Sequence, residues 1–271
     1  MLPNFVVIGA PRSGTSWIHQ NLMRHPEIFV PRIKEVHFFD KHYERGMGYY
    51  ESFFSEWINQ PAIGETTPAY LHGAYSSRDI PALMWKHLPG AKLIACLRNP
   101  TERAYSRYWN SKAKYRKNAG LTFEQKLVDR PEFIAEGFYF DQLKRFYNLF
   151  PREQILVTLY DDLRDRPGEF LREIYRFLGV AASFDAGLEG IRVNAAAGKR
   201  HLARSGIVWS ASALLAYIGL RSAAERLRKD NSVTIPPMSP ETREHLVEVY
   251  KDKNRDLEQL IGRDLSHWDQ H

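Results

Sequence analysis

Two short segments rich in glycine, hydroxyl and arginine residues have the composition of phosphate-binding loops. The first runs from Gly9 to Ser16, reads G-A-P-R-S-G-T-S and follows an apolar run. It resembles the phosphate loop G-x-x-x-x-G-K-[ST], but Thr15 replaces the lysine and Arg12 supplies a cation three residues earlier. The amides from Ser13 onward would open a helix whose N-terminus attracts anions. The simpler alternative is a strand-to-helix turn that uses glycine and serine only as turn and cap residues.

The second segment follows the apolar run KLIACL and begins at Arg98. In nucleoside triphosphatases a second strand commonly delivers an aspartate for magnesium, whereas an arginine repels a metal and suits a phosphate. Ser106 lies eight residues on, a little over two helical turns, so its hydroxyl can face the start of that helix. We expect Arg98 and Ser106 to bind a phosphate well separated from the first; the alternative is a surface salt bridge of Arg98.

Hydrophobic periodicity and punctuation by proline and glycine predict the elements that position these loops. We expect strands at residues 4–8, 62–65, 91–97 and 154–160. We expect helices at residues 14–25, 79–88, 100–114, 137–150, 166–178 and 240–261. Their alternation predicts an α/β fold, a single P-loop-like domain over residues 1–271 with a mostly parallel β-sheet and helices on both faces. Ligands of such sheets bind at the carboxyl ends of the strands.

Composition limits the class of protein. The 271 residues carry a formal charge of +6, which favours an anionic ligand without indicating nucleic acid. A lone cysteine, Cys96, excludes an intramolecular disulfide and a cysteine-based zinc site, and the scattered histidines predict no metal. The longest apolar run, residues 206–220, is shorter than the roughly 20 residues of a membrane span. We expect a buried helix there, or alternatively a lid or wall for an apolar acceptor, and we place the chain in the cytoplasm.

Together the two segments resemble the sulfotransferases that use 3′-phosphoadenosine 5′-phosphosulfate (PAPS). The family's loop P-[KR]-[ST]-G-T-[ST], which holds the 5′-phosphosulfate, is matched by Pro11-Arg12-Ser13-Gly14-Thr15-Ser16. Its motif R-[ND]-P-x-x-R-x-x-S, which holds the 3′-phosphate, is matched from Arg98 through Arg103 to Ser106. The resemblance implies PAPS as donor co-substrate, without a metal.

Further matches are closest to the heparan-sulfate type of sulfotransferase. Glu35-Val36-His37-Phe38-Phe39-Asp40 matches a segment whose glutamate is the general base in that family, so the resemblance implies this role for Glu35. The match also has two departures: Thr66 stands where heparan-type enzymes have a lysine near the acceptor, and residues 231–233 replace a Lys-Gly-Arg loop that lies on the cofactor in that family. We expect a carbohydrate or small-metabolite acceptor, with a hydroxyl or an amine as the group that is sulfonated.

The residue types suit an in-line displacement at sulfur. A carboxylate near the acceptor removes its proton, and we assign this to Glu35. Arg12 stabilises the leaving phosphate oxygen by charge alone, because its pKa is too high for a general acid. His37 orients the acceptor or Glu35. For these residues the alternatives are a rim salt bridge of Glu35 and a hydrogen-bonded core histidine.

Other basic residues have weaker assignments. Lys34 could assist Arg12 or be a solvated lysine, and Lys199 with Arg200 could close over the nucleotide. The run from Lys112 to Lys117 could meet an acidic acceptor, although a solvated helix face is the simpler interpretation.

Two other functions remain open on the sequence. One is a P-loop kinase or nucleotidase, against which Thr15 and Arg98 both argue. The other is a non-catalytic protein that binds phosphoadenosine nucleotides, which would be indifferent to the loss of Glu35.

Overall fold

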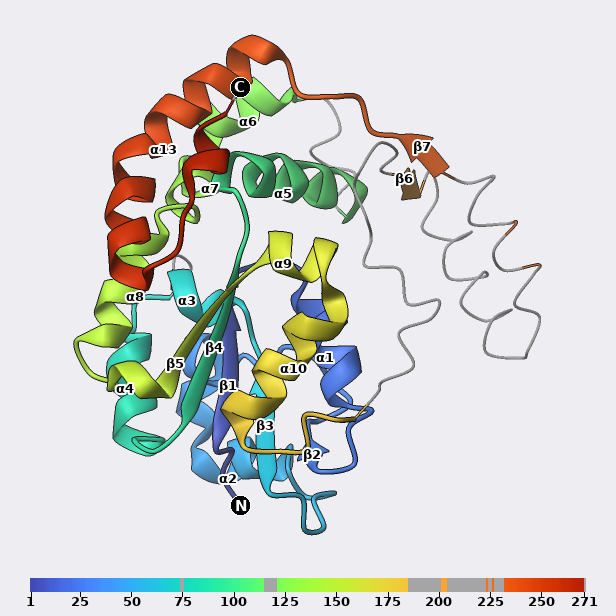
Figure 1. The fold of residues 1–271 in the computed structure, drawn as a ribbon, viewed down its shortest axis with the longest axis vertical. Coiled ribbons are helices and arrows are strands. Elements are labelled where there is room, and N and C mark those ends of the chain that lie inside the picture. Colours follow the sequence, from blue (N-terminus) through green and yellow to red (C-terminus); the bar gives the residue numbers. More distant parts are fainter. Residues whose placement is uncertain are drawn as a thin grey trace.

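The computed structural model describes residues 1–73, 76–114, 121–184, 201–203, 223, 226 and 232–270. A sheet of five parallel strands in the order β2-β3-β1-β4-β5 forms its centre, and helices cover both faces (Figure 1). The strands are β1 (Phe5–Gly9), β2 (Ile28–Phe29), β3 (Ala62–Thr66), β4 (Lys92–Leu97) and β5 (Ile155–Leu159). The predicted α/β fold is therefore confirmed. A second, antiparallel sheet that the sequence did not predict pairs β6 (His201–Ala203) with β7 (Ser232–Thr234).

The described helices include all six that the sequence predicts, with shifts of a few residues at their ends. They are α1 (Thr15–Leu22), α2 (Met47–Ser52), α3 (Ala69–His72), α4 (Ile80–His87), α5 (Pro100–Lys114), α6 (Phe123–Asp129), α7 (Glu132–Ala135), α8 (Tyr139–Tyr147), α9 (Tyr160–Asp165), α10 (Pro167–Leu178) and α13 (Pro240–Ile261). Shorter helical turns are η1 (Phe38–His42), η2 (Tyr43–Arg45), η4 (Arg152–Gln154) and η5 (Ser266–Asp269). The predicted strand 154–160 is one residue too long at each end, because Tyr160 already begins α9.

Strands β1 and β4 are buried on both faces, which explains why they read as apolar runs. In β1, Val6 and Ile8 pack into one hydrophobic cluster, while Phe5 and Val7 pack into another on the opposite face. This alternation follows the two-residue period of a strand. Each face therefore needs its own covering helices.

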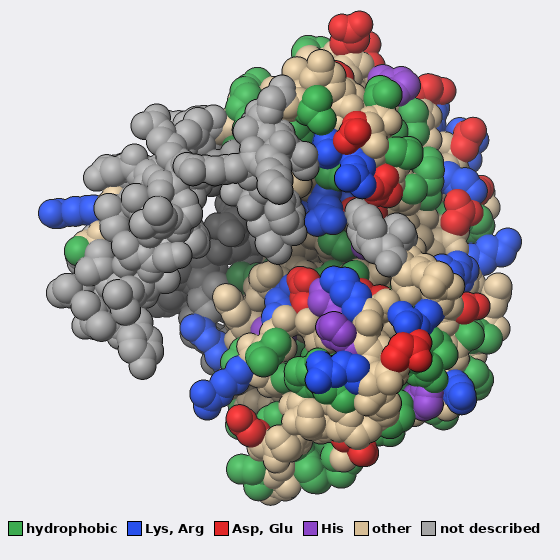
Figure 2. Space-filling view, turned by 180° about the vertical axis from the view of Figure 1, so that it is seen from behind, with side chains coloured by type: hydrophobic (Ala, Val, Ile, Leu, Met, Phe, Trp, Pro, Cys, Tyr) green, Lys and Arg blue, Asp and Glu red, His purple; other side chains and the backbone are tan. Residues whose placement is uncertain are grey.

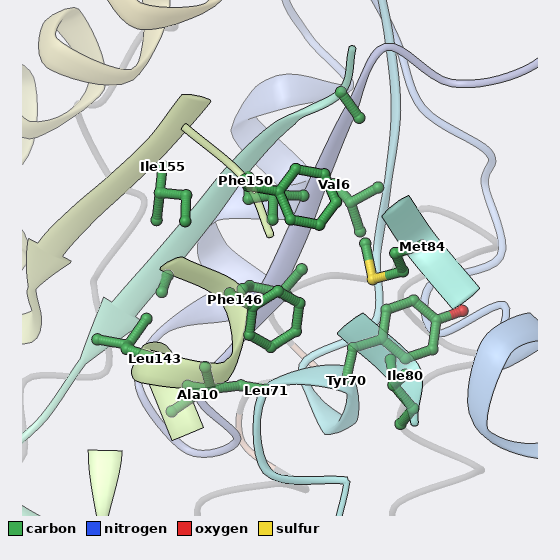
Figure 3. Packing of buried hydrophobic residues seen from close by; sticks show 14 of the residues in the cluster. Val6, Ala10, Tyr70, Leu71, Ile80, Met84, Leu143, Phe146, Phe150 and Ile155 are labelled. Atoms are coloured by element: carbon green, nitrogen blue, oxygen red, sulfur yellow. The ribbon is translucent and has the colours of Figure 1, made fainter. Parts of the chain in front are cut away.

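Helices α3, α4 and α8 cover the first face. Figure 3 shows their side chains packed together with Val6 of β1 and Ile155 of β5; the helical residues labelled there are Tyr70, Leu71, Ile80, Met84, Leu143 and Phe146. Helices α1, α9 and α10 cover the second face, where Trp17 and Leu163 belong to the other cluster. Buried apolar area on both faces fixes the sheet as a rigid frame for its strand ends.

A third cluster lies among α5, α6, α7 and α13, which Figure 1 shows above the sheet. It includes Tyr105 and Tyr108 of α5, Phe123 of α6, Phe133 of α7 and Tyr250 of α13. Because α5 follows directly from β4, this cluster holds α5 beside the carboxyl ends of the strands.

Several predictions fall on residues outside the described ranges, namely those for Lys199 and Arg200, for the apolar run 206–220 and for Lys117. Among the helices that the structure describes, none combines the length and the apolar character needed to cross a membrane.

Candidate active site

The loop between β1 and α1 has the backbone of an anion-binding turn. Gly14 adopts a left-handed conformation with φ of 84° and precedes the first helical residue, Thr15. A Cβ atom at Gly14 would lie 2.4 Å from Cδ2 of Leu163, so the loop approaches α9 too closely for any side chain. The first amides of α1 lie at the open end of the helix, where an anion can accept from them.

Arg12 links this loop to the second predicted motif. Its Nε donates to Oγ of Ser106 at 3.2 Å, and its Nη1 donates to Oδ1 of Asn110 at 3.1 Å. Both partners lie on α5, which the neighbouring strand β4 positions. The two segments that the sequence predicts to bind phosphate are therefore adjacent, and Asn110 joins them although its sequence context gives no signal.

Arg98 lies at the junction of the two motifs and is only 8% exposed. Its guanidinium donates to the carbonyl oxygen of Arg12 at 3.4 Å, forms an ion pair with Glu102 at 3.4 Å and lies over the ring of Tyr160 at 4.8 Å. Arg98 thus makes a salt bridge, as the alternative interpretation expected, but from a buried position beside the phosphate loop rather than on the surface.

The rest of the second motif shapes α5. The side chain of Asn99 accepts from the amides of Thr101 and Glu102, which caps the helix, and Pro100 occupies its first position. Arg103 points elsewhere: it is fully buried and forms an ion pair with Glu136 at 2.7 Å. Of the two arginines in the motif, Arg98 is therefore beside the phosphate loop and Arg103 is part of the interior.

Glu35 and His37 lie at the end of β3, the other neighbour of β1. The amide of Glu35 donates to the carbonyl of Thr66 at 2.9 Å. Both Glu35 and His37 have positive φ angles, 68° and 53°, which non-glycine residues rarely adopt. Strands β3, β1 and β4 are adjacent in the sheet, so Glu35 beside the end of β3, the phosphate loop after β1 and Arg98 after β4 lie at three neighbouring strand ends.

A chain of charged contacts surrounds Glu35. Its two carboxylate oxygens contact Nζ of Lys34 at 2.6 Å and Nε2 of His37 at 3.4 Å, while Nδ1 of His37 contacts Asp40 at 2.8 Å. The hydrogen bond from His37, together with the charge of Lys34, lowers the pKa of Glu35 to about 2 against the effect of burial. Burial and the nearby charge of Lys41 favour neutral His37, but the hydrogen bonds to Asp40 and Glu35 and the negative charge of Asp40 outweigh both and raise the pKa of His37 to about 9. At neutral pH the site therefore contains ionised Glu35 and imidazolium His37.

This ion pair predicts a pH-dependent contribution of His37 to stability. The folded protein binds the imidazole proton more tightly than the unfolded chain, so the stabilisation is complete below pH 6.5 and is lost as the pH rises through about 9. Over this window the unfolding free energy of the wild type should fall relative to that of His37→Gln, by at most about 1.4 kcal/mol per pH unit. Urea unfolding at a series of pH values checks this, and parallel curves for the two proteins would contradict it.

His19 is a neighbouring residue that sequence reasoning missed. It is 4% exposed on α1, and its Nδ1 lies 3.2 Å from Oγ1 of Thr66. Burial and the charge of Lys34 lower the pKa of His19 to about 4, which keeps it neutral. The hydroxyl of Thr66 is thus paired with a neutral imidazole.

The molecular surface agrees with an anionic ligand. Figure 2 shows lysine, arginine and histidine side chains gathered near the middle of one face, around a hollow between its upper and lower parts. Acidic side chains lie beside several of these basic ones in the same view.

Comparison with known proteins assigns the chain to a family. A family model described as "Sulfotransferase domain" matches residues 2–194, which is more than half of the chain. The chain belongs to the sulfotransferase family. A crystal structure of a sulfotransferase from Alicyclobacillus acidocaldarius is similar over 100% of both chains, with a TM-score of 0.75 and 26% sequence identity. The recognised family and the P-loop-like fold are therefore confirmed.

Curated sulfotransferase relatives match nearly the whole chain at similar identity. The membrane-associated sulfotransferase kil1 of Dictyostelium discoideum is 24% identical over 97% of this chain and 66% of its own length. The bifunctional heparan sulfate N-deacetylase/N-sulfotransferase 3 of Mus musculus is 27% identical over 98% of this chain. The chain spans only 31% of that mouse enzyme. It spans 65% of the mouse heparan sulfate glucosamine 3-O-sulfotransferase 3B1, which is 25% identical.

Proposed function

We propose that this chain transfers the sulfonate of PAPS to a hydroxyl or amine of a carbohydrate or small-metabolite acceptor. The observation that carries the proposal is the contact of Arg12 with Ser106, which joins two phosphate-binding motifs at neighbouring strand ends. A nucleotide with phosphates on both its 5′ and 3′ positions matches two such motifs. Thr15 in place of a lysine, and Arg98 in place of a metal-binding acid, argue against a kinase or nucleotidase.

The loop has features that fit the 5′-phosphosulfate. The hydroxyl of Ser13 is buried and has no hydrogen-bond partner among the described residues, as expected for a donor that awaits a ligand oxygen. The left-handed Gly14 precedes α1, and the first amides of a helix, here those of Thr15 and Ser16, have no acceptor within the helix. Arg12 adds a forked cation at the edge of the loop.

The proposed roles in catalysis follow from charge and position. When bound, PAPS supplies a sulfonate that leaves its phosphate oxygen as an acceptor atom attacks the sulfur. Arg12 stabilises the charge that develops on that oxygen, and Lys34 is the second cation available nearby. Glu35 accepts the proton of the acceptor hydroxyl or amine, and His37 holds the Glu35 carboxylate from the side opposite to Lys34.

The low pKa of Glu35 limits its strength as a base while His37 and Lys34 both contact it. An acceptor that takes over the hydrogen-bonding position of Lys34 would relieve part of this effect, because Lys34 contributes to the lowered pKa. We therefore propose that acceptor binding and activation of Glu35 are coupled.

The acceptor class rests on the relatives and on local chemistry. The curated relatives include enzymes named for heparan sulfate, a sulfated polysaccharide. In this chain the Thr66 hydroxyl replaces a lysine and pairs with neutral His19, so this position carries no cation for an anionic polymer. A neutral carbohydrate or a small metabolite fits this better.

An acceptor screen tests the proposed function. Purified protein is incubated with PAPS and pools of carbohydrates, amino sugars and small hydroxylated metabolites, and mass spectrometry detects the gain of one sulfonate. Formation of sulfated product without added metal supports the proposal. Turnover of ATP with Mg²⁺, and none of PAPS with any acceptor, would favour the kinase or nucleotidase instead.

Nucleotide binding gives a separate prediction at Arg98. Adenosine 3′,5′-bisphosphate should bind far more tightly than AMP without metal, and Arg98→Ala should weaken its binding by roughly ten- to a hundredfold, since a hydrogen bond to a charged group contributes about 1.5–3 kcal/mol. AMP lacks the 3′-phosphate, so Arg98→Ala should hardly change AMP affinity. Calorimetry with both nucleotides checks this, with exposed Arg166→Ala as the control. Equal affinities of the wild type for AMP and the bisphosphate would contradict the two-phosphate site.

A further inference from the structure

A fully buried carboxylate is connected by hydrogen bonds to the Glu35–His37 segment. Glu65, on β3, has no exposed surface and accepts hydrogen bonds from three hydroxyls. Tyr50 and Tyr70 donate to its Oε1 at 2.9 and 3.1 Å, and Thr67 donates to its Oε2 at 2.6 Å. These three hydroxyl side chains are also fully buried. A buried carboxylate that accepts hydrogen bonds from three buried hydroxyls forms a specific polar network with them within the apolar core.

Two of these hydroxyls continue the network to the backbone of the candidate active site. Oγ1 of Thr67 accepts from the amide of His37 at 3.4 Å. The Tyr70 hydroxyl accepts from the amides of Phe38 and Phe39 at 2.9 and 3.3 Å. Each hydroxyl donates its proton to Glu65 and accepts from the segment above, so the carboxylate fixes which way both hydroxyls point.

The segment held in this way has an uncommon conformation. The positive φ angles of Glu35 and His37 are sparsely populated for residues with side chains, so the surrounding contacts must hold them. The amides of residues 37–39 begin η1, and they point at the Thr67 and Tyr70 hydroxyls instead of at preceding carbonyls. The direction of the His37 side chain, between Glu35 and Asp40, depends on that backbone.

We propose that Glu65 is a positioning residue of the sulfotransferase site, which acts through Thr67 and Tyr70 to hold the backbone of residues 37–39 and thereby the His37 imidazole against Glu35. This inference rests on the proposed function for the catalytic importance of Glu35 and His37. The position of the imidazole itself is a property of the chain alone.

The charges around the network are consistent with this role. Burial raises the pKa of Glu65 to about 7, although the bonds from Thr67, Tyr50 and Tyr70 oppose the shift; Asp40 on η1 adds a repulsive charge. The groups that face His37 are Glu35, Asp40 and Lys41, with Lys34 beyond Glu35. A small displacement of the His37 ring would therefore change its distance to two carboxylates at once.

Tyr50 provides a matched control within the same network. Its hydroxyl donates to Glu65 but, unlike those of Thr67 and Tyr70, comes from α2 and accepts no amide of residues 37–39 in the described structure. Tyr50→Phe therefore removes one bond to the buried carboxylate and leaves the link to His37 in place. Glu65→Gln keeps the shape but turns an amide group toward Thr67 or the tyrosines, which reverses part of the network.

The test compares Glu65→Gln and Tyr70→Phe with Tyr50→Phe. Because small misplacements of reacting groups can cost up to about a hundredfold, we expect Glu65→Gln and Tyr70→Phe to lower kcat roughly ten- to a hundredfold, with bisphosphate affinity within about twofold of wild type. NMR titration of the His37 ring should show its pKa falling from about 9 toward the ordinary 6.5. Tyr50→Phe should lower the melting temperature but keep kcat within about threefold and leave the His37 titration unchanged.

The outcomes separate the inference from the proposed function. If Tyr50→Phe lowers kcat and shifts the His37 titration as much as Glu65→Gln does, or if neither Glu65→Gln nor Tyr70→Phe moves the His37 titration, the network is only structural and the inference is wrong. If His37 responds as expected but the wild type sulfonates no acceptor, the positioning role stands and the proposed function fails. Should Glu65→Gln not fold, Tyr70→Phe and Thr67→Val test the same links with the carboxylate intact.

Discussion

Glu35→Gln is expected to lower turnover by about a hundredfold or more and to leave bisphosphate affinity nearly unchanged. Glutamine keeps the size of the side chain but can neither accept a proton nor attract the His37 imidazolium. The loss should appear in kcat, because among the described residues the side chain of Glu35 contacts Lys34 and His37 rather than the phosphate loop motifs. Steady-state kinetics with an acceptor from the screen, together with calorimetry for the nucleotide, measure both quantities.

A matched control for this substitution is Glu56→Gln. Glu56 is exposed and makes a long ion pair of 3.9 Å with Arg32, so its change to glutamine should leave kcat at the wild-type value. Wild-type turnover by Glu35→Gln would show that the base lies elsewhere. Unaltered nucleotide binding in a protein that never sulfonates any acceptor would support the non-catalytic binding protein.

Arg12→Ala is expected to weaken both nucleotide binding and turnover, in contrast to Glu35→Gln. Arg12 contacts Ser106 and Asn110, so its loss removes a cation from the phosphate loop and the link between the two motifs. We expect bisphosphate affinity to fall roughly ten- to a hundredfold and kcat to fall by a further 10²- to 10³-fold, about the effect of one donor to a developing anion.

Arg12→Lys separates charge from geometry. Lysine keeps the charge but has no planar fork, so it cannot bond Ser106 and Asn110 in the same way, and we expect partial activity between those of Arg12→Ala and wild type. Arg32→Ala, at a highly exposed arginine, is the control for loss of a positive charge. Loss of binding without any loss of kcat in Arg12→Ala would show that Arg12 only holds the nucleotide.

Local patterns were sufficient to predict most of the framework. The periodicity of α13 predicted its limits to the residue, and the structure shows what fixes them: the Ser239 side chain caps the start, and Gly262 adopts the left-handed conformation at the end. The buried strands β1 and β4 and the loops that follow them were also found, since glycine, proline and apolar runs are local signals. The sequence did not predict the shortest elements, because a strand or helix of so few residues shows no clear hydrophobic periodicity. These elements are the β6–β7 pair and the helices α2, α3, α6, α7 and α9.

The site residues that belong to a local sequence motif could be predicted. Those whose role depends on a contact with a distant part of the chain could not. The two motifs that contain Arg12, Arg98 and Ser106 predicted two well-separated phosphates, and the structure places these three residues together where the motifs meet. Asn110 and Glu65 carried no signal, because each takes its meaning from a partner far away in the chain, Arg12 for Asn110 and the backbone of residues 37–39 for Glu65. The roles of Glu35 and His37 remain predictions that the kinetics must test.

The buried pair of Arg103 and Glu136 has a consequence for how the second motif encodes its function. Both side chains lack exposed surface, so the pair sets the rotation of α5 about its own axis: any turn of the helix would pull the guanidinium away from the carboxylate that compensates it, in a medium that cannot solvate it. Ser106 lies about one turn further along the same helix. The direction in which its side chain leaves the helix is therefore fixed by the same ion pair. One short stretch of sequence thus specifies both a ligand contact and the angular alignment that makes the contact possible.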